Sequence, residues 1–116
     1  MKSALLAIGI IFFLSCNEGQ TNKEGIIEKS KMTNILVDIH IAEAKVNQAK
    51  LPMDSALSYY KYLESNIYEK YEIDSAQFNS SMHYYAENIK ELDKIYETVL
   101  DSLNLRSAEK DKHENN

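Results

Sequence analysis

The chain has 116 residues, a formal net charge of −5 at pH 7 and one cysteine. This acidity argues against nucleic acid as a partner, because phosphates are bound by clustered lysine and arginine side chains. A single cysteine rules out a disulfide within the chain. Three glycines, one proline and no tryptophan argue against an all-β fold, since strands need frequent turn residues.

The first residues have the pattern of an export signal. Lys2 precedes an uncharged apolar run, ALLAIGIIFFL, over residues 4–14. As a helix this run would measure about 16 Å, roughly half of a ~30 Å hydrocarbon core, so a transmembrane helix is not expected. A secretory apolar region fits both the length and the flanks. The alternative, a buried element of the mature domain, is disfavoured because nothing polar interrupts the run.

The end of this run, FLSC, resembles the lipobox of bacterial lipoprotein signal peptides. There a small residue, here Ser15, precedes a cysteine that receives diacylglycerol before cleavage. Phe13 departs from the leucine that is usual at its position. We therefore predict a signal peptide over residues 1–15 and acyl chains, including palmitate, on Cys16. Two or three acyl chains hold a protein firmly in a membrane, whereas one does not.

Removing the signal peptide leaves 101 residues (116 − 15), enough for one small domain. Asn17 stands where an aspartate would, in some bacteria, mark retention in the inner membrane, so the outer membrane is the favoured location in the cell envelope. We predict a lipidated flexible tether over residues 16–28, a helical domain over residues 29–105 and a disordered polar tail over residues 106–116.

Three helices are expected in this domain. The first, at about residues 30–48, is apolar on nearly all sides, which is typical of a central helix. The second follows Pro52, with Asp54 as its N-cap. The third opens at Asp74, where Gln77 takes the capping-box position.

The third helix carries the strongest periodic signal, since its apolar side chains alternate spacings of four and three. These positions are Phe78, Met82, Tyr85, Ile89, Leu92, Tyr96, Val99 and Leu103. Such a register favours one continuous helix. Asn88 and Glu91 can cap a new helix, so a kink or a split near residues 86–88 is the alternative. The expected fold class is an all-α, small antiparallel bundle of three helices.

Three stretches carry a family resemblance: MTNILVDIHIAEAKVNQ, SYYKYLESNIYEKYEID and FNSSMHYYAENIKELDKIYETVLDSL. The motif residues are Ile35, Leu36, Asp38, Ala42, Glu43, Ala44, Tyr71, Phe78, Ser81, Tyr84, Tyr85, Ile95 and Tyr96. In this order, over roughly residues 25–103, they resemble a family of small bacterial lipoproteins known as a domain of unknown function. Members often carry a proline near position 89, where this chain has Ile89. The resemblance implies a lipid-anchored helical domain of Gram-negative bacteria, and it implies no activity.

Asp38, His40 and Glu43 are the candidates for a metal site on the first helix. At about 100° per residue, His40 and Glu43 lie roughly 60° apart and can touch, whereas Asp38 points about 140° to 160° away from each. One ion cannot collect all three from this helix. His83 has no second histidine or glutamate at ligand spacing. We therefore expect no metal and no cofactor.

Glu43 lies about 40° from the centre of the apolar stripe, where a carboxylate is costly unless it is hydrogen-bonded. We predict that it meets a hydroxyl of Ser81, Tyr84 or Tyr85. A structural contact that fixes the helix register is the favoured role. A shielded acid with a raised pKa is the alternative.

A hydrolase is not expected from Ser81 and His83. These side chains point about 160° apart on a helix, and the chain has no Gly-x-Ser-x-Gly elbow. It also has no glycine-rich phosphate loop and no paired zinc spacing. We predict that the protein is not an enzyme.

Two classes of function stand. The first is a non-catalytic interaction or structural lipoprotein that docks to another envelope component through exposed tyrosines, since tyrosine is enriched at interfaces. The candidate surface tyrosines are Tyr59, Tyr62, Tyr68 and Tyr84. The second is a small-ligand or metal binder with a polar pocket around Glu43. A filled bundle with exposed tyrosines favours the first class, and a cavity lined by Glu43 favours the second.

Overall fold

The computed structural model describes residues 25–115, which form four α-helices. They are α1 (Lys29–Ala49), α2 (Met53–Lys70), α3 (Ser75–Glu87) and α4 (Ile89–Glu114). The all-α class is confirmed, but the helices number four where three were expected. The predicted signal peptide, Cys16 and most of the predicted tether lie outside the described residues. None of the described helices is long and apolar enough to cross a membrane.

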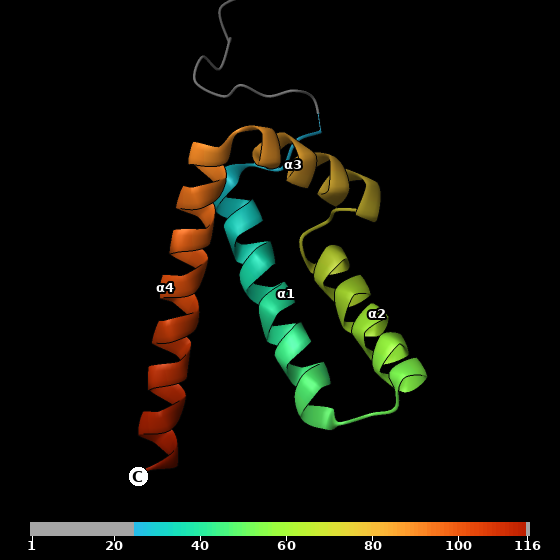
Figure 1. The fold of residues 1–116 in the computed structure, drawn as a ribbon, viewed down its shortest axis with the longest axis vertical. Coiled ribbons are helices and arrows are strands. Elements are labelled where there is room, and N and C mark those ends of the chain that lie inside the picture. Colours follow the sequence, from blue (N-terminus) through green and yellow to red (C-terminus); the bar gives the residue numbers. More distant parts are fainter. Residues whose placement is uncertain (1–24, 116) are drawn as a thin grey trace, which may run out of the picture.

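Helix α1 lies between α2 and α4, and α3 crosses one end of this layer (Figure 1). The central position agrees with the apolar character of α1, which carries more buried side chains than any other described helix. Helix α2 runs antiparallel to α1, but α4 runs parallel to it (Figure 1). The expected fully antiparallel order is therefore wrong for α4. Because α3 carries the chain across the end of the layer, α4 begins beside the start of α1.

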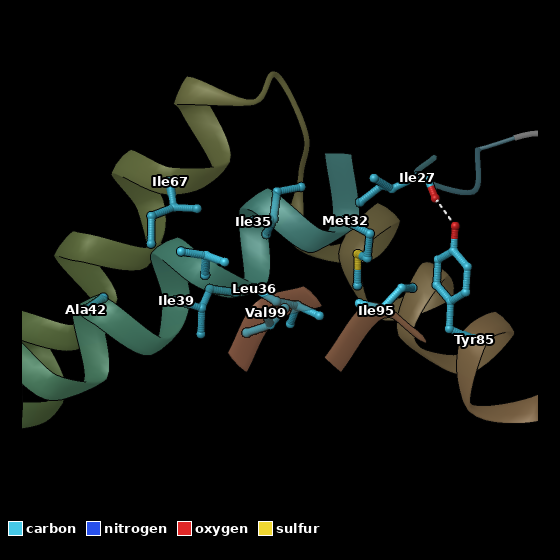
Figure 2. Packing of buried hydrophobic residues seen from close by; sticks show 11 residues of the cluster. Ile27, Met32, Ile35, Leu36, Ile39, Ala42, Ile67, Tyr85, Ile95 and Val99 are labelled. Carbon is cyan, nitrogen blue, oxygen red and sulfur yellow. Dashed lines mark hydrogen bonds between the residues drawn. The ribbon is translucent and has the colours of Figure 1, made fainter. Parts of the chain in front are cut away.

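The core is built on α1 and is closed by side chains from every other helix (Figure 2). Met32 and Ile35 are fully buried, as is Ile95 of α4 at 1% exposed. Burial of one such side chain contributes about 1.5–3 kcal/mol to folding. The wholly buried apolar cluster comprises Ile27, Met32, Ile35, Leu36, Val37, Ile39, Ala42, Ile67, Tyr85, Ile95 and Val99.

The chain breaks between α3 and α4 at Asn88, the alternative that the capping pattern left open. Asn88 has φ −114° and ψ 71°, outside the helical region. Its side-chain amide donates to the carbonyl of Tyr84 at 2.8 Å, and its own carbonyl accepts from the N–H groups of Glu91 and Leu92. One residue thereby ends α3 and starts α4. Ile89 is the first residue of α4, a position that also suits proline.

The seam expected on α4 differs from the structure at two positions. Ile89, expected in the periodic seam, is 59% exposed, while Ile95, which lies outside that seam, is buried. The other predicted seam positions of α4 keep their place, since Val99 is buried and Leu92, Tyr96 and Leu103 pack against the core.

Both ends of the predicted domain differ from the structure. Ile27, placed in the flexible tether, is 2% exposed and belongs to the core. The polar tail expected over residues 106–116 instead continues α4 to Glu114. The exposed residues of this segment include good helix formers such as Lys110. Its Nζ lies 3.9 Å from Oε1 of Glu114, one turn later. Local propensity and such pairs support helix without any apolar periodicity.

The starts of α2 and α3 differ in their capping. Asp74 accepts a hydrogen bond from the N–H of Gln77 at 2.7 Å, which confirms it as the N-cap of α3. Pro52, rather than Asp54, is the N-cap residue of α2, and Asp54 lies in the first turn. A carboxylate there still favours the helix through its dipole.

Candidate functional site

Two polar clusters join parts of the chain that are distant in sequence. The first is the Ile27 cluster, formed by Ile27, Ser81 and Tyr85. The backbone N–H of Ile27 donates to Ser81 Oγ at 2.8 Å, and its carbonyl accepts from the Tyr85 hydroxyl at 2.6 Å (Figure 2). Ser81 Oγ in turn donates to the carbonyl of Gln77 at 2.8 Å. Helix α3 thus satisfies both backbone groups of a buried residue that precedes α1.

The second is the Asp38 cluster, formed by Asp38, Lys70, Tyr71 and Arg106. Asp38 Oδ2 accepts from Lys70 Nζ at 2.7 Å and from the Tyr71 hydroxyl at 2.8 Å. Arg106 lies farther off, with 3.9 Å between its guanidinium and Asp38 Oδ1. The side chain of Asp38 is only 13% exposed. The cluster therefore joins α1 to the end of α2 and to α4 through one shielded carboxylate.

Asp38 contributes to raised pKa values of both its hydrogen-bond partners, Lys70 and Tyr71. Its hydrogen bond raises the pKa of Lys70, because the bond favours the ammonium form. Desolvation, followed by the hydrogen bond to Asp38, raises the pKa of Tyr71. The Lys70 ammonium also lies 5.0 Å from the centre of the Tyr71 ring, within cation–π range. At neutral pH the charged Lys70 ammonium and the neutral Tyr71 hydroxyl thus both donate to Asp38.

A groove of about 340 Å³ lies beside the Asp38 cluster, mainly between α1 and α2. Its lining combines cationic and apolar side chains: Asp38, Ile41, Ala42, Lys45, Leu63, Asn66, Ile67, Lys70 and Arg106. We call it the α1–α2 groove. Such a lining can hold a ligand that is both charged and apolar.

The structure does not place Glu43 where the sequence indicated. Its side chain is 48% exposed, and Oε2 lies 3.2 Å from Nδ1 of His40, the neighbour that helical spacing brings close. The predicted contact with a hydroxyl of α3 is therefore wrong, since the hydroxyls of Ser81 and Tyr85 bond to Ile27 and Gln77 instead. The charge of Glu43 acts on Tyr60 of α2, where it is a minor contributor to a raised pKa. Glu43 does not line the α1–α2 groove.

Asp38 carries, in the sequence around it, a local signal for a buried polar contact. Its neighbours at i−3, i+3 and i+4 are Ile35, Ile41 and Ala42, so its flank of the helix is apolar. A carboxylate among apolar neighbours needs partners from elsewhere. Its partners have no such signal, because the end of α2, for Lys70, and an exposed stretch of α4, for Arg106, are ordinary places for a charged residue.

The expected tyrosine surface is smaller in the structure. Tyr62 is 64% exposed, but Tyr68 and Tyr84 are half-buried and pack against the core. The Tyr68 ring lies 5.6 Å from that of Phe78 and joins α2 to α3. The Tyr84 ring meets that of Tyr85 edge-on at 5.1 Å. Within residues 25–115, no three His, Cys, Asp or Glu side chains are grouped to hold a metal ion.

The fold and these clusters define a small all-α domain held together by polar links between distant segments. The chain belongs to the family of a domain of unknown function (DUF4296), whose model matches residues 24–109. No curated protein and no solved structure matches the chain. The matched range begins before the Ile27 cluster and includes Arg106, so both polar clusters belong to the family domain.

Proposed function

We propose that this protein is a lipid-anchored component of the cell envelope that acts as a non-catalytic interaction or structural module. The acyl anchor is Cys16, in the lipobox-like FLSC after an apolar run. Export and attachment through two or three acyl chains follow from that pattern. Asn17 favours the outer membrane.

The observation that carries the proposal is the attachment of Ile27 at both its N–H and its carbonyl. Ile27 follows Cys16 by eleven residues (27 − 16), a length that can span at most about 36–40 Å. An acyl anchor on Cys16 would thus connect to a rigid point on the domain. A domain held in this way keeps its α3 end near the membrane, and the connection between α1 and α2 lies at the other end (Figure 1).

That far end carries several of the exposed apolar side chains that suit a protein partner. Leu51, Met53 and Leu57 are 40%, 86% and 53% exposed, and they lie at and just after the α1–α2 connection. Tyr62, on the same helix, is 64% exposed. Methionine and tyrosine are enriched at protein interfaces. An envelope protein that docks on this end is the proposed partner.

Two experiments test the two halves of the proposal. Cys16→Ala should abolish labelling by radioactive palmitate and leave an uncleaved or mis-sorted precursor. Normal labelling and anchoring of that variant would refute the lipoprotein assignment. A photo-crosslinking residue at Met53 should capture a specific envelope protein in intact cells, whereas one at the exposed Glu87 of α3, at the opposite end of the domain, should not. Equal capture patterns at both positions would refute docking at the far end.

A further inference from the structure

We infer that the α1–α2 groove binds a small anionic amphiphile, a molecule with one acidic head and a short apolar body. The groove volume, about 340 Å³, lies at the lower end of the range for small-molecule sites, ~300–1,000 Å³. This site is separate from the proposed anchor on Cys16 and does not depend on it. The inference rests on the charge of the groove and on its apolar floor.

Positive charge is concentrated in the groove although the chain as a whole is acidic. Lys45, Lys70 and Arg106 line it against one carboxylate, that of Asp38, within a chain of net charge −5. Asp38 is already compensated, because its Oδ2 accepts from both Lys70 and Tyr71. The excess of cations therefore favours an anion.

Arg106 is the side chain suited to hold the acidic head. It is 57% exposed, and at 3.9 Å from Asp38 Oδ1 it lies beyond hydrogen-bond distance. A guanidinium presents a planar fork of N–H donors that matches a carboxylate or a phosphate. It can bind such a head while Lys70 and Tyr71 keep their bonds to Asp38.

The floor of the groove explains why the ligand needs an apolar body. Ile41 and Ala42 of α1 face Leu63 and Ile67 of α2 across it. Ala42 is the smallest of these side chains. Contact with such a surface stabilises a ligand in proportion to the apolar area removed from water. An inorganic anion would leave this floor wet.

A second groove, between α1 and α4, lacks the same excess of charge. Its lysines are Lys29 and Lys94. Lys29 Nζ lies 2.5 Å from one carboxylate oxygen of Glu91, and Lys94 Nζ lies 3.8 Å from the other. Since these cations share a local carboxylate, the α1–α2 groove is the better anion site.

The test is a titration of the full chain against the free concentration of each probe, followed through its backbone amide NMR signals. Three probes separate the components: hexanoate, hexan-1-ol and acetate. Hexanoate should saturate shifts at residues that line the groove, and each other probe should bind at least about tenfold more weakly. Equal binding of acetate would reduce the groove to a counter-ion site and overturn the inference. Equal binding of hexan-1-ol, or no saturable shift with hexanoate, would also overturn it.

Variants connect the binding to named side chains. Arg106→Gln should weaken hexanoate binding about tenfold. Lys110→Gln, the same change of charge one turn later on α4, should alter it less than about twofold. Lys45→Gln is a second groove variant, at a lysine that does not contact Asp38. It tests the same assignment if Arg106→Gln perturbs α4. Unchanged hexanoate affinity in both groove variants would refute the assignment.

Discussion

The Ile27 cluster and the Asp38 cluster do the same structural task with opposite chemistry. Both join segments far apart in sequence through tyrosine hydroxyls. The Ile27 cluster is neutral and dry, with Ser81 and Tyr85 at 0% and 5% exposed. The Asp38 cluster is charged and reaches water, since the side chain of Lys70 is 62% exposed. The free energy of unfolding should therefore fall when the neutral cluster loses a hydrogen bond. The contribution of the charged cluster should instead depend on the salt concentration.

High pH should have the largest effect, because it acts on both clusters. Desolvation raises the pKa of Tyr85, and desolvation with the bond to Asp38 raises that of Tyr71. Desolvation and the charge of Glu64 raise the pKa of Tyr60 to about 12. Below the ordinary value of 10.0 folded and unfolded chains both keep these protons, so the stabilisation is complete. It is lost as the pH rises through the higher folded-state values, because the unfolded chain ionises first.

We therefore expect cooperative unfolding at a pH between about 10 and 12. Circular dichroism and tyrosinate absorbance should change together in one transition. If most tyrosines titrate near pH 10 while the helical signal persists, the hydroxyls are not shielded as the structure indicates.

Next in size is the loss of the aromatic ring in the Ile27 cluster. Tyr85→Ala should lower the free energy of unfolding by about 3–5 kcal/mol, because it leaves a cavity and removes the bond to Ile27. Urea unfolding measures this change. Tyr62→Ala, at an exposed position of α2, is the control and should cost much less. Similar costs at the two positions would contradict the burial of Tyr85.

Removal of a single hydroxyl should have a smaller effect on the free energy of unfolding. Ser81→Ala leaves the buried N–H of Ile27 without its acceptor, at a cost of about 1–3 kcal/mol. Hydrogen exchange of the Ile27 amide should accelerate in the same variant. Ser80→Ala, its exposed neighbour on α3, should leave both quantities unchanged. A slow Ile27 amide in Ser81→Ala would mean that another group protects it.

The smallest effect is expected in the charged cluster. Asp38→Asn keeps the shape but removes the charge, and should cost about 1 kcal/mol at low salt, since exposed partners are screened by water. The difference from the parent should shrink as salt rises to about 1 M, where the Debye length is near 3 Å. Glu43→Gln, on the same helix, should change stability by less than about 0.5 kcal/mol. A loss of stability in Asp38→Asn that does not change with salt concentration would contradict the distinction between the two clusters.

The sequence by itself determined what depends on neighbours within one helical turn. The helices up to about residue 105, the N-cap at Asp74 and the pair His40–Glu43 follow from spacings of three or four residues. The central position of α1 follows from apolar side chains on most of its faces. The family resemblance, confirmed over residues 24–109, likewise rests on the residues of the sequence.

Only the tertiary structure decided which polar side chains meet. Glu43 and Asp38 are both acids on α1, and the periodic pattern favoured Glu43, yet the partners converge on Asp38. Lys70 and Tyr71 come from the end of α2, and Arg106 comes from the last part of α4, so only the approach of Arg106 depends on the break at Asn88. A single residue there turns the chain from α3, which crosses the end of the layer, into α4, which runs parallel to α1 (Figure 1). Periodicity describes the faces of one helix, but it contains no information on the direction in which the next helix leaves.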